Sequence, residues 1–464
     1  MSQKKHLVSE AFFNDPRIKQ ALDLIKQTVT EHRSKITGLK NPHPELTEKY
    51  EKVLKDFSQN RGGDLYYKYI GSGIGNGALV ELTDGSTKYD FITGIGVHYF
   101  GHSHPDVINA QIMGALSNTT MSGNLQQNQD SQELMQTFIT EAQKYGSKLE
   151  HIFLTSSGAM AGENALKMAF CKKFPASRIL TFKNCFMGRT LALSQITDKA
   201  LYRKGLPSTL KVDYLSFYDY KDHEGSIKNT LKELNTYFTR YPNDYAAICM
   251  ELVQGEGGYY VGHTEFFKAI INECKKNNVA IVVDEVQTFA RSSKMYCFQH
   301  FNLDQDVDIV TVGKNSQVCA TLFTTEFKPP VGLISQTFTS ANSTIAAANF
   351  ILKDLINNNY FGENGKINKF HQQFKNGLEK INQKYPDLLE GPYGLGAMIG
   401  MTVFKGDNDK SKKYTFKLFD NGVMGFLAGA SPSRVRFLMP MGAVTENDVN
   451  EVLKIIEKTL LEIN

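Results

Sequence analysis

Two short apolar runs, each followed by a charged residue, dominate the hydrophobic pattern of the chain. Residues 279–283 precede Asp284, and residues 309–313 precede Lys314. Runs of this length with little alternation between apolar and polar residues are typical of strands buried on both faces of a parallel sheet. Ligands of open α/β sheets bind beyond the ends of such strands. The pattern therefore predicts that Asp284 and Lys314 lie at a ligand-binding edge.

The rest of the pattern predicts an α/β protein. Strand and helix patterns alternate from about residue 97 to residue 330, which is the signature of a mostly parallel sheet covered by helices. After Asn342 come a long helical stretch, a glycine-punctuated strand segment at 391–404 and an amphipathic helix at 445–461. A chain of 464 residues is long enough for two or three domains with a sizeable core.

The N-terminal part reads as helices and loops up to about residue 70, with Asp15 and Pro16 opening a helix. Residues 71–77 are rich in glycine and look like a nucleotide-binding loop. A dinucleotide fingerprint needs a strand before it and a helix after it, whereas residues 78–92 predict a hairpin. We therefore interpret the glycine-rich segment as part of a hairpin.

An aspartate and a lysine at strand ends are the residue types that pyridoxal phosphate chemistry requires. A lysine amine can form a Schiff base with the aldehyde of this cofactor. A carboxylate beside the pyridine nitrogen keeps that nitrogen protonated, so that the ring withdraws electrons from the substrate. A lone aspartate or lysine is more often an ordinary solvated residue, so the neighbouring segments decide between the two interpretations.

A third segment, at 151–173, combines an apolar strand, a turn of small residues and a helix of strong helix formers. Ser157, Gly158 and Ala159 are expected at the N-terminus of this helix, where free backbone amides and the helix dipole favour a phosphate group. The Ser157 hydroxyl would add a donor, and Gly158 would allow close approach. In isolation such a turn is more often only a helix cap.

Six segments form an ordered set of motifs: SSGAMAGENALKMAF at 156–170, FMGRTLALS at 186–194, ELVQGEGG at 251–258, VVDEVQT at 282–288, DIVTVGK at 308–314 and VRF at 435–437. Together they resemble the class III pyridoxal phosphate-dependent aminotransferases, also called the ornithine or ω-aminotransferase family. The resemblance extends from about residue 71 to the C-terminus. The wording GKNSQVCA at the lysine is most similar to the lysine 6-aminotransferases.

The resemblance implies a fold-type I transferase, with a large domain around a mostly parallel seven-stranded sheet and a small α+β domain from both termini. The expected boundaries are 1–97 for the N-terminal part of the small domain, 98–343 for the large cofactor-binding domain and 344–464 for the C-terminal part. A homodimer with active sites at the interface is also implied, in which Thr337 or Thr339 reaches the cofactor phosphate of the neighbouring subunit.

The resemblance also implies roles for the residues around the cofactor, which is expected to be pyridoxal 5'-phosphate. Lys314 would be the Schiff-base lysine and would move the proton, and Asp284 would contact the pyridine nitrogen. Gln287 would contact the phenolic oxygen, and Phe186 would stack on the ring. The spacing independently supports two of these roles, because an aspartate at a strand end and a residue three positions later can reach adjacent ring positions.

Three charged residues are candidates for substrate binding. The resemblance implies that Glu256 pairs with Arg436 while the distal amine of a donor reacts, and that Arg436 is released to bind a 2-oxo acid. A buried guanidinium without a partner would be costly, so an exchangeable acid is physically reasonable. Arg189 resembles the arginine that binds the donor's carboxylate. Without the resemblance, Glu256 and Arg436 would be better interpreted as a surface ion pair or as two unrelated charges.

The chain departs from the family pattern around the expected pocket. Met187 stands where a histidine is usual, Ala159 and Met160 replace a Ser-Glu pair, and residues 315–317 replace a run of glycines. The lysine, aspartate and glutamine of the cofactor site are intact. These departures therefore bear on the identity of the substrate more than on cofactor binding.

Composition narrows the function classes further. The net charge of +4 is small and no basic stripe with interleaved aromatic residues occurs, so no nucleic-acid or membrane partner is expected. His98, His102 and His104 match no metal-ligand spacing, and no metal is predicted. The six cysteines are dispersed, and the N-terminus lacks the apolar core of a signal peptide. Free thiols in a cytoplasmic protein are therefore predicted.

The sequence as a whole predicts a pyridoxal phosphate-dependent transaminase. It would move the terminal amine of a lysine-type or ornithine-type donor to 2-oxoglutarate by a ping-pong mechanism. One alternative is an aminomutase or decarboxylase of the same family that uses the same lysine and aspartate. The other is a non-catalytic protein on the aminotransferase fold, against which the intact Lys314, Asp284 and Gln287 argue.

Overall fold

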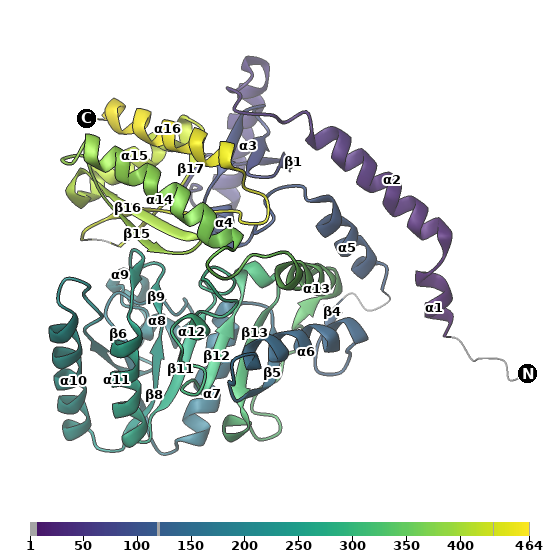
Figure 1. Ribbon diagram of the computed structural model, residues 1–464. Helices are drawn as coiled ribbons and strands as arrows, with labels where there is room; N and C mark the ends of the chain where they lie inside the picture. Colours follow the sequence, from purple (N-terminus) through teal and green to yellow (C-terminus); the bar gives the residue numbers. More distant parts are fainter. Residues whose placement is uncertain (1–6, 118–120, 430, 464) are drawn as a thin grey trace, which may run out of the picture.

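The computed structural model describes residues 7–117, 121–429 and 431–463. A large α/β unit lies at the bottom of Figure 1, a smaller α/β unit lies above it, and the N-terminal helices extend to one side. No helix in the described ranges is both long and apolar enough to cross a membrane.

The large unit is built on a seven-stranded sheet. β13 pairs antiparallel with both of its neighbours, and all other neighbouring strands pair in parallel. The predicted mostly parallel sheet is therefore confirmed, and the two apolar runs form β11 and β12. In spatial order the strands are β5 (Leu149–Thr155), β13 (Cys319–Thr324), β12 (Ile309–Val312), β11 (Ala280–Glu285), β8 (Tyr245–Met250), β6 (Arg178–Phe182) and β7 (Lys211–Leu215).

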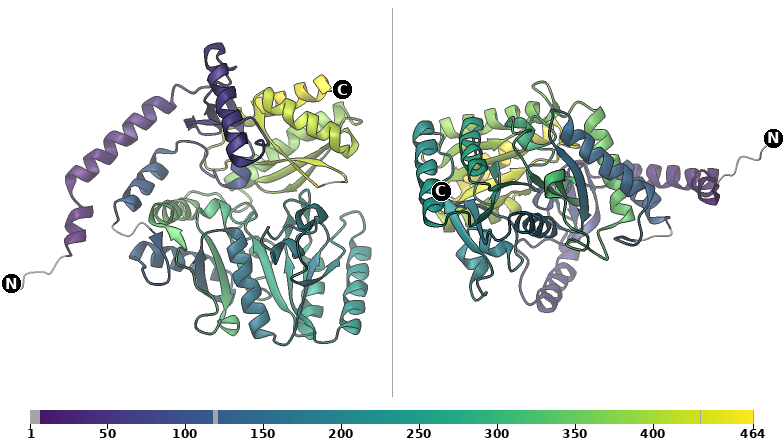
Figure 2. Two further views of the ribbon diagram at one scale, coloured as in Figure 1. Left: turned by 180° about the vertical axis from the view of Figure 1, so that it is seen from behind. Right: turned by 90° about the horizontal axis from the view of Figure 1, so that it is seen from below.

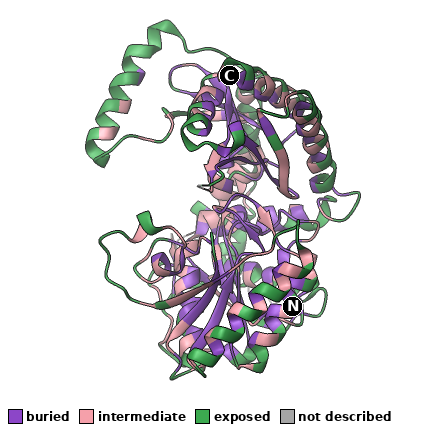
Figure 3. Cartoon of the chain, turned by 90° about the vertical axis from the view of Figure 1, so that its left-hand side faces the viewer, coloured by how far each residue is buried: buried purple, intermediate pink, exposed green. Residues whose placement is uncertain are grey.

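Helices cover both faces of this sheet. α7 (Gly158–Lys172) and α11 (Thr264–Lys276) lie on opposite faces, as the two views from front and back show (Figures 1 and 2). Alternate residues of β8 accordingly belong to two different apolar clusters, Ile248 to the cluster that holds α11 and Cys249 to the cluster that holds α7. This two-sided burial explains why the strands read as apolar runs without alternation. Figure 3 shows the strands buried inside and the outer helices exposed.

The remaining helices of the large unit frame its edges. These are α5 (Pro105–Ala115), α6 (Gln129–Gln143), α10 (His223–Arg240) and α13 (Asn342–Asn357). α13 packs against α5 and α6. The boundary predicted after residue 343 falls inside α13, and we propose to place it after this helix, because α13 packs with helices of the large unit.

The small unit contains two four-stranded sheets. The first has the order β1 (Gly71–Asn76), β2 (Leu79–Leu82), β3 (Thr87–Asp90) and β17 (Val423–Met424). β1, β2 and β3 pair antiparallel, as the predicted hairpin requires, and β17 pairs in parallel with β3. Strands from both ends of the chain thus share one sheet. The second sheet has the order β15 (Leu389–Leu395), β16 (Met398–Val403), β19 (Arg434–Leu438) and β18 (Phe426–Ala428).

The helices outside the large unit begin with a predicted cap. Asp15 is the N-cap of α2 (Pro16–Arg33), and its Oδ1 accepts the amide of Arg17 at 2.9 Å. Neither α1 (Val8–Phe13) nor α2 contains a buried residue. The small unit adds four further helices, α3 (Pro44–Arg61), α14 (Lys366–Lys384), α15 (Asn408–Asp420) and α16 (Glu446–Ile463).

Short elements complete the fold and carry several residues of the site. They are α4 (Thr93–Gly96), β4 (Met121–Ser122), α8 (Leu193–Ile196), α9 (Ala200–Arg203), β9 (Val253–Gln254), β10 (Tyr260–Val261), α12 (Cys297–His300), η1 (Lys314–Ser316), η2 (Thr325–Phe327), β14 (Ser340–Ala341) and η3 (Phe404–Gly406).

Candidate active site

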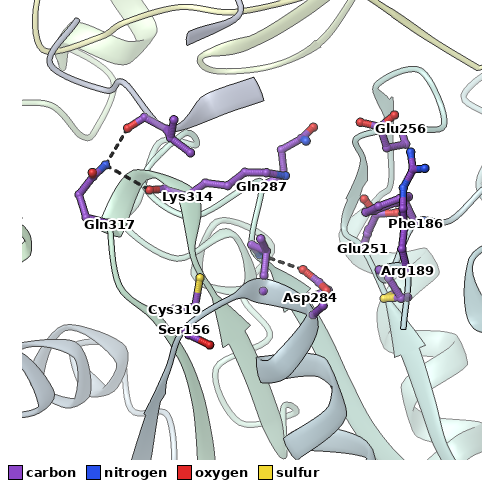
Figure 4. Close-up of a pocket in the computed structure, with 16 residues that line it drawn as sticks. Ser156, Phe186, Arg189, Glu251, Glu256, Asp284, Gln287, Lys314, Gln317 and Cys319 are labelled. Atoms are coloured by element: carbon purple, nitrogen blue, oxygen red, sulfur yellow. Dashed lines mark hydrogen bonds between the residues drawn. The ribbon is translucent and has the colours of Figure 1, made fainter. Parts of the chain in front are cut away.

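A cavity of about 490 Å³ lies at the C-terminal ends of β11 and β12. This is the edge at which open α/β sheets bind ligands. Eight of the residues singled out from the sequence line it together (Figure 4). They are Gly158, Ala159, Phe186, Arg189, Glu256, Asp284, Gln287 and Lys314.

Lys314 follows β12, and its side chain extends across the cavity from the side of Gln317 toward the wall that holds Glu256 (Figure 4). Its φ of 54° lies in the left-handed region, which is costly for a residue with a side chain. The pKa of its amine is lowered to about 8, mainly by burial, with Arg291 and Arg436 adding to the fall and Glu256 and Asp284 opposing it. A substantial neutral fraction near physiological pH suits a nucleophilic amine.

Asp284 stands near the end of β11, opposite Thr311 of β12. Its Oδ1 accepts the amide of Val286 at 2.9 Å. Burial raises the pKa of this carboxyl to about 6, although the Val286 amide, the Lys314 amine and Thr311 oppose the rise. A carboxylate in this position gains most from a cation placed against it in the cavity, and a protonated pyridine nitrogen is such a cation.

The turn before α7 has the geometry of a phosphate-binding helix N-terminus. Ser157 is the N-cap, and its hydroxyl oxygen accepts the amide of Met160 at 3.2 Å. Gly158 and Ala159 line the cavity with the first amides of the helix, which have no partner within the helix itself. A Cβ at Gly158 would meet the side chain of Val286 at 2.8 Å, so glycine is required here by packing against the segment that follows Asp284. The predicted close approach of a phosphate stays a prediction.

Sequence reasoning missed the carboxylate that holds the opposite wall. Glu251 follows β8, is only 6% exposed, and accepts the amides of Phe186 at 2.8 Å and Gly255 at 3.0 Å. It therefore ties the predicted ring-stacking residue to the loop that carries Glu256. Burial raises the pKa of this carboxyl to about 8, against the effect of the two amides. It lies within the ELVQGEGG motif, which was the available signal.

Replacing Glu251 by glutamine tests this wall. The single oxygen of the glutamine side chain still accepts a hydrogen bond from one backbone amide. Its NH₂ group faces the second amide and cannot accept a hydrogen bond from it. We expect kcat/KM for transamination to fall roughly tenfold, because one of the two hydrogen bonds is lost and a buried amide is left without an acceptor. Steady-state kinetics measure the effect, with Glu265→Gln at the surface as the control. Unchanged kinetics would show that Glu251 does not position Phe186.

Glu256 and Arg436 form the predicted ion pair. Nη2 of Arg436 donates to Oε1 of Glu256, and Nη1 donates to Oε1 of Gln287 at 3.2 Å. The side chain of Arg436 is fully buried. Because Arg436 lies on β19 of the small unit and Glu256 lies in the large unit, the ion pair joins the two units. Burial alone would lower the pKa of Arg436, but Glu256 raises it above its ordinary value. The pair is therefore ionised, with only the acid facing the cavity.

Arg189 lies at the exposed mouth of the cavity. Its guanidinium carbon is 3.8 Å from the ring centre of Tyr202 and 6.0 Å from that of Phe186. A guanidinium held flat on an aromatic ring keeps its edge free for a carboxylate. The position is compatible with the predicted role of binding a donor's carboxylate.

Thr337 and Thr339 do not line the cavity of their own subunit. The hydroxyl of Thr339 is buried and donates to the carbonyl of Ser122 at 2.9 Å, whereas Thr337 is exposed. Their predicted contact with a neighbouring subunit therefore stays a prediction, and the exposed Thr337 is the one whose hydroxyl faces solvent.

Two further lining residues, near the lysine, had no role assigned from the sequence. Gln317 donates through Nε2 to the carbonyl of Val97 at 2.7 Å and lies near the carbonyl of Lys314 (Figure 4). Cys319 lies on β13 beside the lysine turn. Both belong to the segment GKNSQVCA, where the family usually has glycines after the lysine. The glutamine side chain thus closes a part of the wall that glycines would leave open.

The clustered histidines have structural roles. Nε2 of His102 is 2.9 Å from Asp90, and Nδ1 of His104 accepts the amide of Val107 at the start of α5. Within the described ranges, one group has side chains close enough together to hold a metal, and it consists of His223, His263 and Glu265. These residues lie at the N-termini of α10 and α11, whose positive ends disfavour a cation. We interpret the group as a surface ion pair.

Comparison with known proteins places this cavity in a family. The chain matches the class III aminotransferase family model over residues 70–460 and therefore belongs to the class III aminotransferases. These enzymes use pyridoxal phosphate, and the lysine, the aspartate and the helix N-terminus described above fit that cofactor. The chain is thus a pyridoxal phosphate-dependent aminotransferase.

The match with curated relatives covers nearly the full length of each of them. An acetylornithine aminotransferase of Caldanaerobacter subterraneus is 28% identical over 412 residues, covering 86% of this chain and 97% of that protein. A diaminobutyrate–2-oxoglutarate transaminase of Wolinella succinogenes is 26% identical over 407 residues, covering 83% and 90%.

Solved structures confirm the fold. A lysine aminotransferase from M. tuberculosis superposes with a TM-score of 0.77 at 20% identity, covering 89% of this chain and 100% of that chain. An ornithine aminotransferase from Toxoplasma gondii superposes with a TM-score of 0.74 at 23% identity, covering 89% and 95%. The predicted fold-type I architecture is therefore confirmed.

Proposed function

We propose that the protein is a ping-pong transaminase that takes the terminal amine of a lysine-type or ornithine-type amino acid and passes it to 2-oxoglutarate. The observation that carries this proposal is the buried pair between Glu256 and Arg436. An arginine that is hidden behind its own acid leaves the cavity free of a strong carboxylate site, which favours a donor that enters amine first.

The residues around the cavity have separate tasks in this proposal. When bound, pyridoxal phosphate supplies an aldehyde for the amine and a ring that withdraws electrons from the substrate carbon. Nζ of Lys314 would take the proton from that carbon and deliver it to the carbon of the cofactor that carried the aldehyde. The carboxylate of Asp284 would keep the pyridine nitrogen protonated. The amides of Gly158 and Ala159 bind the phosphate.

Two arginines separate the two substrates by charge. Arg189 at the mouth binds the distal carboxylate of the donor, so that its terminal amine points inward. A 2-oxo diacid brings a second carboxylate, which displaces Glu256 and takes both donor groups of Arg436. The buried guanidinium of Arg436 therefore has a carboxylate partner in both halves of the reaction.

The names of the relatives support this donor class. Acetylornithine and diaminobutyrate both carry an amine at a distance from the carboxylate, and the Wolinella relative is named for transfer to 2-oxoglutarate. The protein is tested by incubation with 2-oxoglutarate and each of lysine, ornithine, acetylornithine, diaminobutyrate and 4-aminobutyrate. Glutamate release with one or more donors supports the proposal. Donor consumption without glutamate would favour an aminomutase or decarboxylase instead.

Replacing Glu256 by glutamine tests the role of the ion pair. The neutral amide leaves the charge of Arg436 uncompensated. The α-carboxylate of the donor is then attracted to Arg436 and not to Arg189. We expect kcat/KM for the best terminal-amine donor to fall roughly tenfold or more, and the rate with glutamate as donor to fall less. The measurement is a single-turnover rate for each donor, compared with Glu265→Gln. Equal losses for both donors would contradict the exchange.

We also propose a homodimer. Three large apolar side chains are highly exposed on two loops that contact each other, with Leu125 at 98%, Val331 at 107% and Phe338 at 59%. The loops are joined where the amide of Asn124 donates to the carbonyl of Gln336 at 3.1 Å. Exposed apolar groups gathered in this way are typical of protein interfaces. Light scattering on the purified protein measures the oligomeric state.

The cysteines support a reducing compartment. All six are free thiols, and Cys185, Cys249, Cys274 and Cys297 are buried. We therefore propose that the protein works in the cytoplasm, where buried thiols stay reduced.

A further inference from the structure

Arg291 is a fully buried arginine beside the active site that no proposed step uses. It follows β11 and is only 2% exposed. Nη1 donates to the carbonyl of Gln287 at 2.7 Å, and Nη2 donates to the carbonyl of Gly96 and to Oδ1 of Asn315, both at 2.6 Å. These acceptors are neutral, and no carboxylate of the described ranges pairs with it. The charge is therefore held by dipoles alone, which is an expensive arrangement.

Each acceptor of Arg291 belongs to, or is next to, a residue that lines the cavity. Gln287 lines it directly, Gly96 precedes Val97, and Asn315 follows Lys314. One planar guanidinium thus joins three separate walls through its fixed fork of donors.

The contact with Asn315 bears on the lysine itself. Nδ2 of Asn315 donates back to the carbonyl of Phe289 at 3.0 Å, so the side chain is held at both ends. Lys314, immediately before it, has a left-handed backbone that persists only when the surroundings fix it. The backbone carbonyl of Arg291 also accepts the amide of Ala397 at 2.9 Å, which ties the same turn to the small unit.

We propose that Arg291 is a positioning residue that fixes the strained turn of Lys314 against the Gln287 loop and places an uncompensated positive charge beside the Lys314 amine. This inference rests on the role proposed for Lys314. It gives the buried charge a purpose that a neutral core residue could not serve, because an apolar side chain would neither fork between three oxygens nor repel an ammonium group.

The electrostatics of the lysine agree with this role. Burial is the largest cause of the lowered pKa of Lys314, and Arg291 and Arg436 lower it further, while Glu256 and Asp284 raise it. The four charges come from three segments of the chain, since Asp284 and Arg291 both belong to β11 and the turn after it. The charged and titratable groups that face Lys314 are Asp284, Glu251, Glu256, Arg291, Arg436 and Cys319.

The first test needs no activity. In cofactor-free protein, the rate at which acetic anhydride modifies Lys314 is measured against pH by peptide mass spectrometry, since only the neutral amine reacts. Arg291→Met removes the charge and the fork, so the profile moves to higher pH and the rate at pH 7.5 falls at least about threefold. Arg291→Lys keeps the charge and moves the profile less. A folded Arg291→Met with the native profile overturns the proposal.

The second test uses the Arg291→Lys variant with bound cofactor and the best amino donor. Because Arg291 touches no substrate, we expect kcat to fall about tenfold while KM for the donor changes less than about twofold. Arg178→Lys, at a partly buried arginine on β6 that pairs with Asp213 at 2.8 Å, is the control for a general loss of arginine contacts away from the cavity. A lower melting temperature with unchanged kcat would show a structural role only and overturn the proposal.

The two tests also separate this inference from the proposed function. If no donor yields glutamate but the modification profile moves as expected, Arg291 positions Lys314 in an enzyme of another reaction. If Arg291→Met does not fold, the kinetic comparison of Arg291→Lys with Arg178→Lys decides the matter.

Discussion

Replacing Lys314 by alanine is expected to lower the transamination rate by roughly 10⁴-fold or more, because Lys314 is the only lysine among the described residues that line the cavity. The visible absorbance of the purified protein should be lost as well, since it depends on a bond between the lysine and the cofactor. Absorbance spectra and glutamate release measure the two effects.

Two controls accompany the Lys314→Ala variant. Lys276→Ala, on the exposed face of α11, should keep both colour and rate. A small soluble amine such as methylamine should restore part of the rate in Lys314→Ala, because it can replace the missing base in the space that the side chain leaves. A variant that keeps the native rate would remove Lys314 from the mechanism.

Asp284→Asn should lower kcat/KM by about 10²-fold to 10³-fold, with little change in the shape of the cavity. The amide has nearly the volume of the carboxylate but carries no charge to hold a proton on the ring nitrogen, and losing one such electrostatic contact costs this much in other enzymes. Steady-state kinetics at saturating cofactor measure the effect. A fall of less than about threefold would show that the ring nitrogen does not depend on this carboxylate.

The same substitution should stabilise the cofactor-free protein above about pH 6. The pKa of Asp284 is raised from 3.8 to about 6 by folding, so the native state is penalised once the carboxylate ionises. The penalty is absent below the unfolded pKa, grows as pH rises from 3.8 to about 6, and amounts to at most about 3 kcal/mol above it. Asp284→Asn should therefore melt higher than the native protein at pH 7.5 and by a smaller margin at pH 5. An equal margin at both pH values would contradict the raised pKa.

The parts of the fold with local signals were predictable from the sequence. The strands β11 and β12 were visible because burial on both faces leaves no polar alternation, and α2 was visible because Asp15 caps it before a proline. Strand direction was not visible. β13 runs antiparallel to its neighbours, and an apolar run carries no information about which way it crosses the sheet.

The site divides in the same way. Asp284, Lys314 and Gly158 could be placed because each is next to a strand end or a helix start. Glu251 and Arg291 could not, since a charged residue normally faces solvent and only the tertiary structure shows which amides and carbonyls surround it. The pairing of Glu256 with Arg436 needed the family resemblance, because the two residues are far apart in the chain.

The sheet that contains strands from both ends of the chain constrains the order in which the two units can fold during synthesis. β3 spans residues 87–90 and its partner β17 spans residues 423–424, so more than three hundred residues must leave the ribosome before the pair can form. The large unit, whose seven-stranded sheet ends with residue 324 and whose last helix ends at residue 357, can fold earlier. Arg436 lies on β19, near the C-terminal end of the chain. During synthesis Glu256 therefore has no Arg436 to pair with until nearly the whole chain has emerged.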